Sequence, residues 1–412
     1  MIKAGRDKWT DNQILDALHG RNGSQCVSFR FDVLRDGVRQ RSITAQGSVS
    51  LNRFADIQRT ARFTLYEELD WLKDEIKPFM RLRMEDTTAD GVVIALIWDD
   101  RDALGLTFDA LDALAMTWDE IDAGRFDGTV RAEQYAEFPL GVFILSTPTR
   151  TSRDALNTWT VEAYDRTVIL VEDSLTEPLL VSAGTTYFDA VQSILVSAGI
   201  SRVIIADLVD TEIPADRVFE IGTKKLTVIN TLLTEINFNP IYCDVDGVFV
   251  LSAYVEPSAS SVDYTYKADE LSIIGRDTKS DLDYFDVPNV FIAVCSNPDL
   301  DQDYTSVWTN DNAASRLSTI QRGRKIVSEI KKPDCIASQN DLNAYIRRVA
   351  FEAHQVYEKL EFVTALNPLH GRAENLQIQH PDATGVFVES SWTLPLSASG
   401  QMSHAARRLI VV

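Results

Sequence analysis

The sequence predicts an α+β protein, mostly antiparallel β, in which two related β domains of the barrel or sandwich type flank a smaller α/β middle domain. Three observations support this prediction: strand-like alternation over the first third, amphipathic helices in the middle, and a hairpin motif that occurs once in each outer region. The 412 residues are enough for two to four domains. The composition, with 45% hydrophobic and 25% charged residues, is typical of globular proteins.

The first third is expected to begin with a short helix and to continue as antiparallel strands. Thr10 is the candidate N-cap of that helix, and Gln13 stands at the capping-box position. The segment CVSFRFDVLRDGVRQRSITAQGSVSLN then alternates as strands do, with a hairpin turn at Asp36-Gly37. Further strands are expected in the segments RTARFTLYEE, PFMRLRMED, GVVIALIW, GVFILSTPTRTS and LNTWTVEAYDR.

The middle of the chain changes to helical periodicity. TTYFDAVQSILVSAGI has Thr186 as a candidate N-cap, one apolar face and Gly199 as its stop. A second helix is expected at KLTVINTLLTEINF, and a hairpin is expected to turn at Asp246-Gly247. The composition of VEPSASSVDY is that of a linker.

Strands are expected to return from about Tyr266, with VPNVFIAVCS as the most apolar, followed by a polar loop over residues 297–314. A long helix is expected over Asp341–Leu360, with Ser338 as its N-cap. Its apolar stripe is expected to pack on the last sheet, formed by LEFVTAL, LQIQH, GVFVESSWTLPL and MSHAARRLIVV. The stripe consists of Leu342, Tyr345, Ile346, Val349, Ala353 and Val356.

A faint internal repeat relates the two outer regions. GVFILS (141–146) and GVFVES (385–390) each open a hairpin, at a constant offset of 244 residues. The simplest explanation is a pair of related β domains, in which the segments 141–166 and 385–410 form equivalent strand pairs.

An acidic decapeptide repeat over residues 98–124 is the most specific feature. An aromatic residue followed by Asp, and then Asp-Ala, recurs with a period of ten residues. Thr107 and Thr117 can cap short helical turns. The pattern fits a self-packed loop insertion, a docking surface for a neighbouring subunit, or calcium capture. The candidate partner-interface residues are Trp98, Phe108, Trp118, Asp102, Asp112 and Asp122.

The net charge of −21 argues against a nucleic-acid binder, because phosphate contacts need clustered Lys and Arg. Acidity fits a surface that DNA passes without binding, and it also fits solubility alone. The chain has no apolar stretch near the roughly 18 residues of a membrane span, and its N-terminus is too polar for a signal peptide. We therefore expect a protein made and used without export through a membrane.

Motifs for catalysis are absent from the sequence, so no catalytic, cofactor-binding or metal-binding residue is assigned. The four cysteines are far apart and are expected to be reduced thiols. His354 and Glu358 stand one helical turn apart, but without a third ligand an exposed surface pair is the favoured interpretation. Asp244 and Asp246 belong to the predicted hairpin rather than to a calcium loop, because the downstream Glu is missing.

Taken in order, these segments resemble the tail hub, or baseplate hub, proteins of long-tailed bacteriophages and related contractile injection systems. The resemblance covers most of the chain and departs from the family at Gly371-Arg372, where Gly-Asp is expected, and at the decapeptide insertion. The residues that carry it are GSVSLNRFADIQRTARFTL, YDRTVILVEDSLTEPLLVSAGTTYFDAVQSILVSAGI, YFDVPNVFIAV, DLNAYIRRVAFEAHQVYEKLEFVTALNPLHGR and GVFVESSWTLPLSASGQMSHAARRL.

The resemblance implies tube-type β domains over residues 1–170, which include the insertion 98–124, and over residues 265–412, which include one long helix. An α+β middle domain would occupy residues 171–264. It further implies a homotrimer that joins the six-fold tail tube to the three-fold tail tip, with DNA passing through its channel without specific binding. Expected partners are the tail tube or distal tail protein, the tape-measure protein, and a tail tip or fibre protein. The expected location is the tail tip or baseplate of the virion, after assembly in the host cytoplasm.

Two other functions compete with this structural, non-enzymatic role. A tail-associated cell-wall hydrolase would need catalytic residues, which the sequence does not offer. A carbohydrate-binding tail protein would use exposed Trp and Asp side chains such as those of the decapeptides.

Overall fold

A computed structural model describes residues 5, 9–21, 25–84, 92–93, 129–130, 134–153, 156–207, 211–257, 262–269, 272–282, 285, 287–296, 302–355 and 358–408. The chain is mostly antiparallel β, with 44% strand and 17% helix, which confirms the predicted fold class. It divides into two compact units. The larger unit contains Phe29–Met80 and Phe138–Val412, and the smaller contains Ala4–Ser28 and Arg81–Glu137.

The smaller unit contains helix α1 (Asp11–Leu18) and an antiparallel pair of short strands, β6 (Val92–Val93) and β7 (Thr129–Val130). The Thr10 hydroxyl accepts a hydrogen bond from the Gln13 backbone, and the Gln13 side chain accepts one from the Thr10 backbone. The predicted capping box is therefore confirmed.

The largest sheet has 15 strands, and its first half has the neighbour order β3-β4-β11-β9-β5-β1, followed by β2 at the edge. The predicted turn at Asp36-Gly37 joins β1 to β2, with φ of 51° and 75° at the two residues. The strands are β1 (Val27–Arg35), β2 (Val38–Ile43), β3 (Ala45–Asn52), β4 (Arg59–Leu65), β5 (Asp74–Met84), β8 (Gln134–Pro139), β9 (Phe143–Leu145), β10 (Thr149–Arg153) and β11 (Leu156–Asp165).

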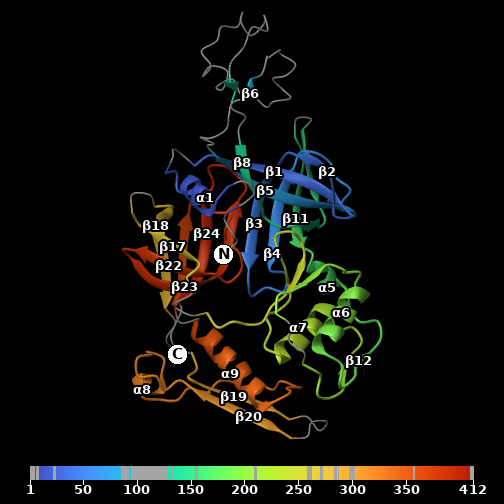
Figure 1. Cartoon of the computed structure of the whole chain (residues 1–412), viewed down its shortest axis with the longest axis vertical. Helices are drawn as coiled ribbons and strands as arrows, with labels where there is room; N and C mark the ends of the chain where they lie inside the picture. The colour runs from blue at the N-terminus through green and yellow to red at the C-terminus, as the bar shows by residue number, and fades with distance from the viewer. Residues whose placement is uncertain are drawn as a thin grey trace, which may run out of the picture. The chain divides into compact units, whose positions relative to one another are not determined.

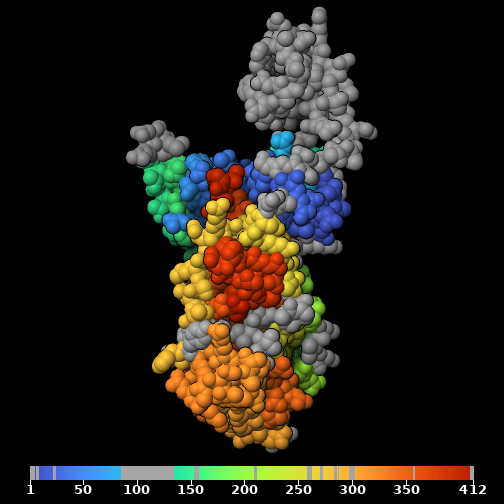
Figure 2. All heavy atoms as spheres, turned by 90° about the vertical axis from the view of Figure 1, so that its left-hand side faces the viewer, coloured from blue at the N-terminus to red at the C-terminus, as the bar shows by residue number. Residues whose placement is uncertain are grey.

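The second half of this sheet is built from the end of the chain. Its neighbour order is β18-β21-β24-β23-β22-β17. The strands are β17 (Tyr264–Lys267), β18 (Ile274–Leu282), β21 (Glu358–Thr364), β22 (Asn375–His380), β23 (Ala383–Pro395) and β24 (Met402–Arg408). In the space-filling view, the yellow segments that contain β17 and β18 lie beside the red segments of β22 to β24, although they are far apart in the chain (Figure 2).

The two halves share one strand order. When β2, β8 and β10 of the first half are set aside, each half has six strands, and numbered along the chain they are arranged 2-3-6-5-4-1. The first four pairings in this order are antiparallel in both halves. The glycine that opens each copy of the repeated motif has positive φ, +139° at Gly141 and +152° at Gly385, where a side chain would be strained. The repeat therefore corresponds to a shared topology.

The paired strands also refine the offset of the repeat. Leu145 lies opposite Ala163 in the first half, and Glu389 lies opposite Ala406 in the second. Leu145 and Glu389 are 244 residues apart, as the matched letters are. Their partners Ala163 and Ala406 are 243 residues apart, so the partner strand is displaced by one residue between the two halves. Side chains alternate between the two faces of a strand, so this register decides which residues of the second copy are buried.

Strand β23 joins the two halves into one sheet. A register shift between Glu389 and Ser391 interrupts its pairing with β24, and beyond it β23 also pairs with β3, from Ser391 opposite Asn52 to Pro395 opposite Ser48. We call this pairing the β3–β23 seam. Red strands of the second half and blue strands of the first accordingly lie side by side (Figure 1).

The middle of the chain has a core of its own. Helices α5 (Val168–Glu172), α6 (Tyr187–Ser197) and α7 (Lys225–Glu235) lie with two small sheets, and Thr186 caps α6 as predicted. The predicted Asp246-Gly247 turn joins β15 to β16. The strands are β12 (Leu179–Val181), β13 (Val203–Ile205), β14 (Arg217–Phe219), β15 (Tyr242–Cys243) and β16 (Phe249–Leu251), and the core includes Leu170, Val191, Ile194, Ile229, Leu232, Leu233 and Phe249.

Between β18 and β21 the chain forms a separate two-stranded sheet with helices. The sequence predicted a strand at VPNVFIAVCS and the long helix, but not that they form a sheet and core of their own. This part of the chain consists of β19 (Val290–Cys295), β20 (Tyr304–Thr309), α8 (Thr319–Arg322) and α9 (Gln339–His354). The predicted polar loop over residues 297–314 is wrong in part, because β20 lies within it.

Helix α9 also corrects two predictions. Its stripe packs on β19 and β20, not on the sheet that holds residues 385–408 (Figure 1). The helix ends at His354 rather than at Leu360, and Leu360 belongs to β21, where alternate side chains are buried. The N-cap prediction is confirmed, since the Ser338 hydroxyl accepts from the Asp341 backbone. The residues that meet in this core are Phe291, Ala293, Cys295, Ile336, Leu342, Ile346 and Ala350.

Candidate functional site

The interface residues predicted from the decapeptide repeat lie outside the described residues. Trp98, Phe108, Trp118, Asp102, Asp112 and Asp122 therefore remain a prediction from sequence. The four cysteines are free thiols; Cys26 is exposed and the other three are buried.

A buried polar network lies inside the second half of the large sheet. The Glu389 carboxylate accepts a hydrogen bond from each of two histidines. Its Oε2 lies 2.8 Å from Nδ1 of His370, and its Oε1 lies 2.6 Å from Nδ1 of His404. The other ring nitrogens meet hydroxyl groups, at 2.5 Å from Tyr266 and 2.8 Å from Thr364. We call these five residues the Glu389 network; each is almost fully buried.

The two histidines of the Glu389 network differ in charge. Burial alone would lower the pKa of His370, but Glu389, Tyr266 and Glu374 outweigh it and raise that pKa well above its usual value. Burial lowers the pKa of His404 despite the same carboxylate. Burial would raise the pKa of Glu389, yet His370 and His404 hold it at about 2. At neutral pH the network is a buried His370–Glu389 ion pair beside a neutral His404.

Within the described residues, His370, Glu389 and His404 are grouped closely enough to hold a metal ion, since one ligand atom of each lies within 4.8 Å of the others. In the structure Nδ1 of each histidine is hydrogen-bonded to its own oxygen of Glu389, and a protonated imidazole, as at His370, cannot ligate a metal. The arrangement is therefore that of a satisfied hydrogen-bond network. Sequence reasoning missed it because the three residues stand on separate segments without a motif spacing.

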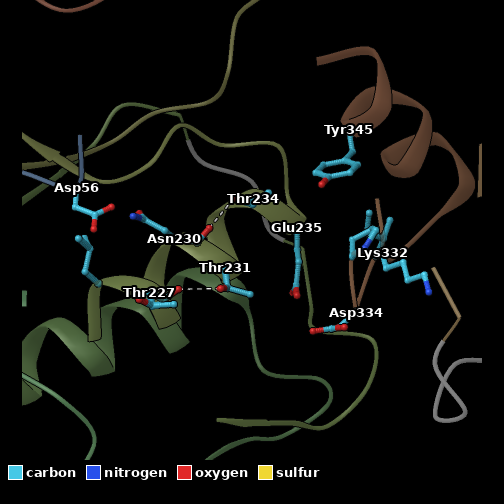
Figure 3. A pocket seen from close by; sticks show the side chains of 12 residues that line it. Asp56, Thr227, Asn230, Thr231, Thr234, Glu235, Lys332, Asp334 and Tyr345 are labelled. Atoms are coloured by element: carbon cyan, nitrogen blue, oxygen red, sulfur yellow. Dashed lines mark hydrogen bonds between the residues drawn. The ribbon is translucent and has the colours of Figure 1, made fainter. Parts of the chain in front are cut away.

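A pocket of about 420 Å³ lies between α7 and α9. Figure 3 shows the polar side chains of α7 on one side and Tyr345 of α9 on the other. The Thr231 and Thr234 hydroxyls donate to the backbone carbonyls of Thr227 and Asn230, so they are already engaged within the helix. The lining residues are Asp56, Leu226, Thr227, Asn230, Thr231, Thr234, Glu235, Lys332, Pro333, Asp334, Ile336 and Tyr345.

Glu235 is the titratable group of this pocket with the clearest perturbation. Burial raises its pKa to about 7 even though Arg217 opposes the shift. Arg217 donates to Oε1 at 2.8 Å and Tyr187 donates to Oε2 at 3.1 Å. A general base must reach the proton that it abstracts, and here both carboxylate oxygens are occupied by the protein. The environment of Glu235 is consequently that of a structural carboxylate.

The predicted exposed pair of His354 and Glu358 is wrong. His354 is fully buried at the end of α9, where Nδ1 lies 2.7 Å from the Ala350 carbonyl and Nε2 lies 3.3 Å from Asn310. Glu358 begins β21 and pairs with Arg408. The two side chains belong to different elements, because the helix stops before Glu358.

The hairpin interpretation of Asp244 and Asp246 holds. The Asp244 carboxylate accepts from the backbone of Asp246 and of Val248, at 2.9 and 2.8 Å. Asp246 forms an ion pair with Lys77 of β5 at 2.6 Å. These contacts are those of a turn fixed against the neighbouring β region.

Comparison with solved structures finds tail proteins with a similar fold. The chain is similar to a tail protein from Neisseria meningitidis MC58, with TM-score 0.59 and 10% identity over 92% of this chain and 97% of that one. It is similar to the 43 kDa tail protein of prophage MuSo2 from Shewanella oneidensis, with TM-score 0.52 and 9% identity over 92% and 98% of the two chains. It is also similar to prophage tail protein gp18 from Listeria monocytogenes EGD-e, with TM-score 0.52 and 8% identity over 92% and 94%.

No protein-family model and no curated protein sequence matches the chain. At identities this low, the likeness shows the fold alone, and this fold is that of phage tail proteins. The resemblance found in the sequence is therefore confirmed for the fold. Among the described helices, none is both long and apolar enough to cross a membrane.

Proposed function

We propose that this protein is a structural component of a phage tail and serves as its hub. The observation that carries the proposal is the strand order that occurs twice in one chain, in a fold shared with phage tail proteins. Two similar β domains in each chain would give a homotrimer six similar units around one axis. Such a ring meets a six-fold tail tube on one side and a three-fold tip on the other without mismatch.

The domain boundaries follow from the same proposal. The β domains would occupy residues 1–170 and 265–412, and the middle domain residues 171–264. The separate core of the middle segment supports this division. The sheet of β19 and β20 with α9 would be an elaboration of the last domain.

The partners would be those of a tail hub: the tail tube or distal tail protein, the tape-measure protein, and a tip or fibre protein. The protein would reside at the tail tip or baseplate of the virion, after assembly in the host cytoplasm. DNA would cross the ring without specific binding, which the net charge of −21 supports, and Asp and Glu should then line the channel. The role would be non-enzymatic, which the occupied carboxylate of Glu235 supports.

The test is the symmetry of the assembled particle. Cryo-electron microscopy of tails that contain this chain should show three copies, with the two β domains of each copy alternating around the axis. Light scattering of the full-length protein, mixed with the tail tube protein of the same genome, should give a trimer bound to a ring. A monomer in the assembled tail would contradict the hub assignment.

A further inference from the structure

Four arginine side chains gather at one place in the larger unit, although the chain as a whole is strongly acidic. We call them the arginine cluster. They come from four separate segments: Arg53 follows β3, Arg348 lies in α9, Arg372 lies between β21 and β22, and Arg407 lies in β24. All four are partly exposed. Such convergence from distant segments is a product of the fold and has no signature in the local sequence.

Aromatic rings hold the guanidinium groups of the arginine cluster. Arg53 and Arg407 both lie over the ring of Phe54, at 4.8 and 4.1 Å from its centroid. Arg348 lies over Tyr254 at 4.3 Å, and Arg372 lies over Tyr242 at 4.9 Å, in the same manner. These contacts orient each planar guanidinium without neutralising its charge.

Negative charge around the arginine cluster is sparse. Glu352 pairs with Arg348 at 3.1 Å, and its side chain is 37% exposed. Arg372 donates instead to the neutral amide oxygen of Gln58 at 2.7 Å. Among the described residues, no carboxylate lies within 4.0 Å of Arg53, Arg372 or Arg407.

The pKa values of three arginines in the cluster are lowered, which shows that their charged forms are disfavoured there. Burial lowers the pKa of Arg53 and Arg407. Burial, together with the positive charges of Arg53 and Arg348, lowers the pKa of Arg372 to about 10. Charged groups that are desolvated and repel one another gain from an anion, and the planar fork of arginine fits a carboxylate in two parallel hydrogen bonds.

We propose that the arginine cluster binds the carboxylates of an acidic segment of a partner polypeptide. A short acidic peptide brings its charges to the cluster alone, whereas an extended nucleic acid would also meet the acidic surface of a chain with net charge −21. The aromatic rings of Phe54, which is 48% exposed, and Tyr254 add apolar contact for a peptide backbone. The site stands on these residues and does not require the trimeric arrangement.

The experiment measures binding of a fluorescently labelled Glu-rich peptide to the full-length protein by anisotropy. Its controls are the same peptide with Gln for Glu, inorganic phosphate as competitor, and a labelled single-stranded oligonucleotide. We expect the Glu peptide alone to bind with measurable affinity, increasingly weakly as salt rises. Arg53→Gln combined with Arg407→Gln should weaken it roughly tenfold or more.

Arg347→Gln is the matched control. Arg347 precedes Arg348 on α9 but has a 66% exposed side chain that pairs with Glu256, so its loss should leave peptide binding unchanged. The double variant should still melt cooperatively near the temperature of the parent, because among the described residues no carboxylate lies within ion-pair distance of Arg53 or Arg407. If it does not fold, Arg407→Gln alone replaces it. Unchanged binding in the variants, equal binding of the Gln peptide, or tighter binding of the oligonucleotide would overturn the proposal.

Discussion

The hydroxyl groups of Ser50 and Thr393 lie 2.9 Å apart across the β3–β23 seam, although 343 residues separate them in the chain. Ser50 lies on β3 of the first half of the sheet, and Thr393 lies opposite it on β23 of the second. This contact joins the two copies of the repeated topology. In the proposed hub, the angle between the β domains within one chain would depend on this seam.

Removing one hydroxyl at the seam should destabilise the larger unit. Thr393→Val leaves the Ser50 hydroxyl without its partner, and the free energy of unfolding should fall by about 1 kcal/mol. Ser50→Ala in the same background should cost less than it does alone, because the two groups act as a pair. Urea unfolding of the four proteins in this cycle provides the measurement. Thr305→Val on the exposed face of β20 is the control and should change the free energy of unfolding little. Additive losses from Ser50→Ala and Thr393→Val would contradict a direct hydrogen bond between the two side chains.

Local signals in the sequence predicted much of this fold. The turns at Asp36-Gly37 and Asp246-Gly247 and the cap of α6 by Thr186 were correct, because each depends on neighbours within a few residues. The match of GVFILS and GVFVES pointed to the shared topology, and the glycine that opens each copy occupies a conformation that other residues rarely adopt.

Elements that depend on tertiary contacts were missed. Strand β20 has a buried Ser306 and an exposed Val307, which reverses the usual pattern, because Ser306 donates to Asn343 on α9 at 2.6 Å. The long helix was predicted to reach Leu360, because its apolar stripe extends to Val356 in the sequence. Leu360 and Phe362 instead follow strand alternation. The Glu389 network and the arginine cluster join segments far apart in the chain, so no local pattern signals either.

Glu389 should be the costliest carboxylate to neutralise in the second half of the sheet. Glu389→Gln replaces the anion between His370 and His404 with an amide, and leaves the charge of His370 buried without its main partner. The loss should be about 3–5 kcal/mol in the free energy of unfolding. Thermal and urea unfolding measure it. Glu361→Gln on β21 is the matched control: its side chain is 39% exposed and pairs with Lys359, so the loss should stay below about 1 kcal/mol. Equal losses would refute the network.

Glu235 should make stability depend on pH near neutrality. Its pKa is about 7 in the folded protein against 4.5 for an ordinary glutamate, so the folded state binds more protons between these values. Its contribution is therefore fully present below about pH 4.5 and is lost as pH rises through 7, a total of about 3 kcal/mol. Glu235→Gln keeps a carbonyl acceptor for Arg217, places an amide N–H beside the Tyr187 hydroxyl, and removes the titration.

The measurement for Glu235 is urea unfolding of parent and Gln variant at several pH values from 5 to 8. The stability of the variant relative to the parent should rise with pH across this range, because other groups titrate equally in both proteins. A constant difference between the two proteins would show that the carboxylate of Glu235 does not titrate there.

The acidic repeat should be removable without loss of the fold. Strands β6 and β7 pair antiparallel, with Val92 opposite Val130 and Val93 opposite Thr129, so the chain leaves and returns at neighbouring points of one ladder. Paired strands lie about 4.8 Å apart, a gap that a few residues span. Deleting residues 99–124 should therefore preserve the far-ultraviolet circular dichroism expected for the remaining elements and the cooperative unfolding of the protein. Assembly with the neighbouring tail proteins should change, because the deletion keeps Trp98 but removes the other candidate interface residues, Asp102, Phe108, Asp112, Trp118 and Asp122. Substituting alanine for Phe108 and Trp118 in the full chain separates side-chain contacts from loop length, and should weaken assembly in the same direction. A deletion variant that fails to fold would show that the repeat belongs to the core, and normal assembly would show that it is no docking surface.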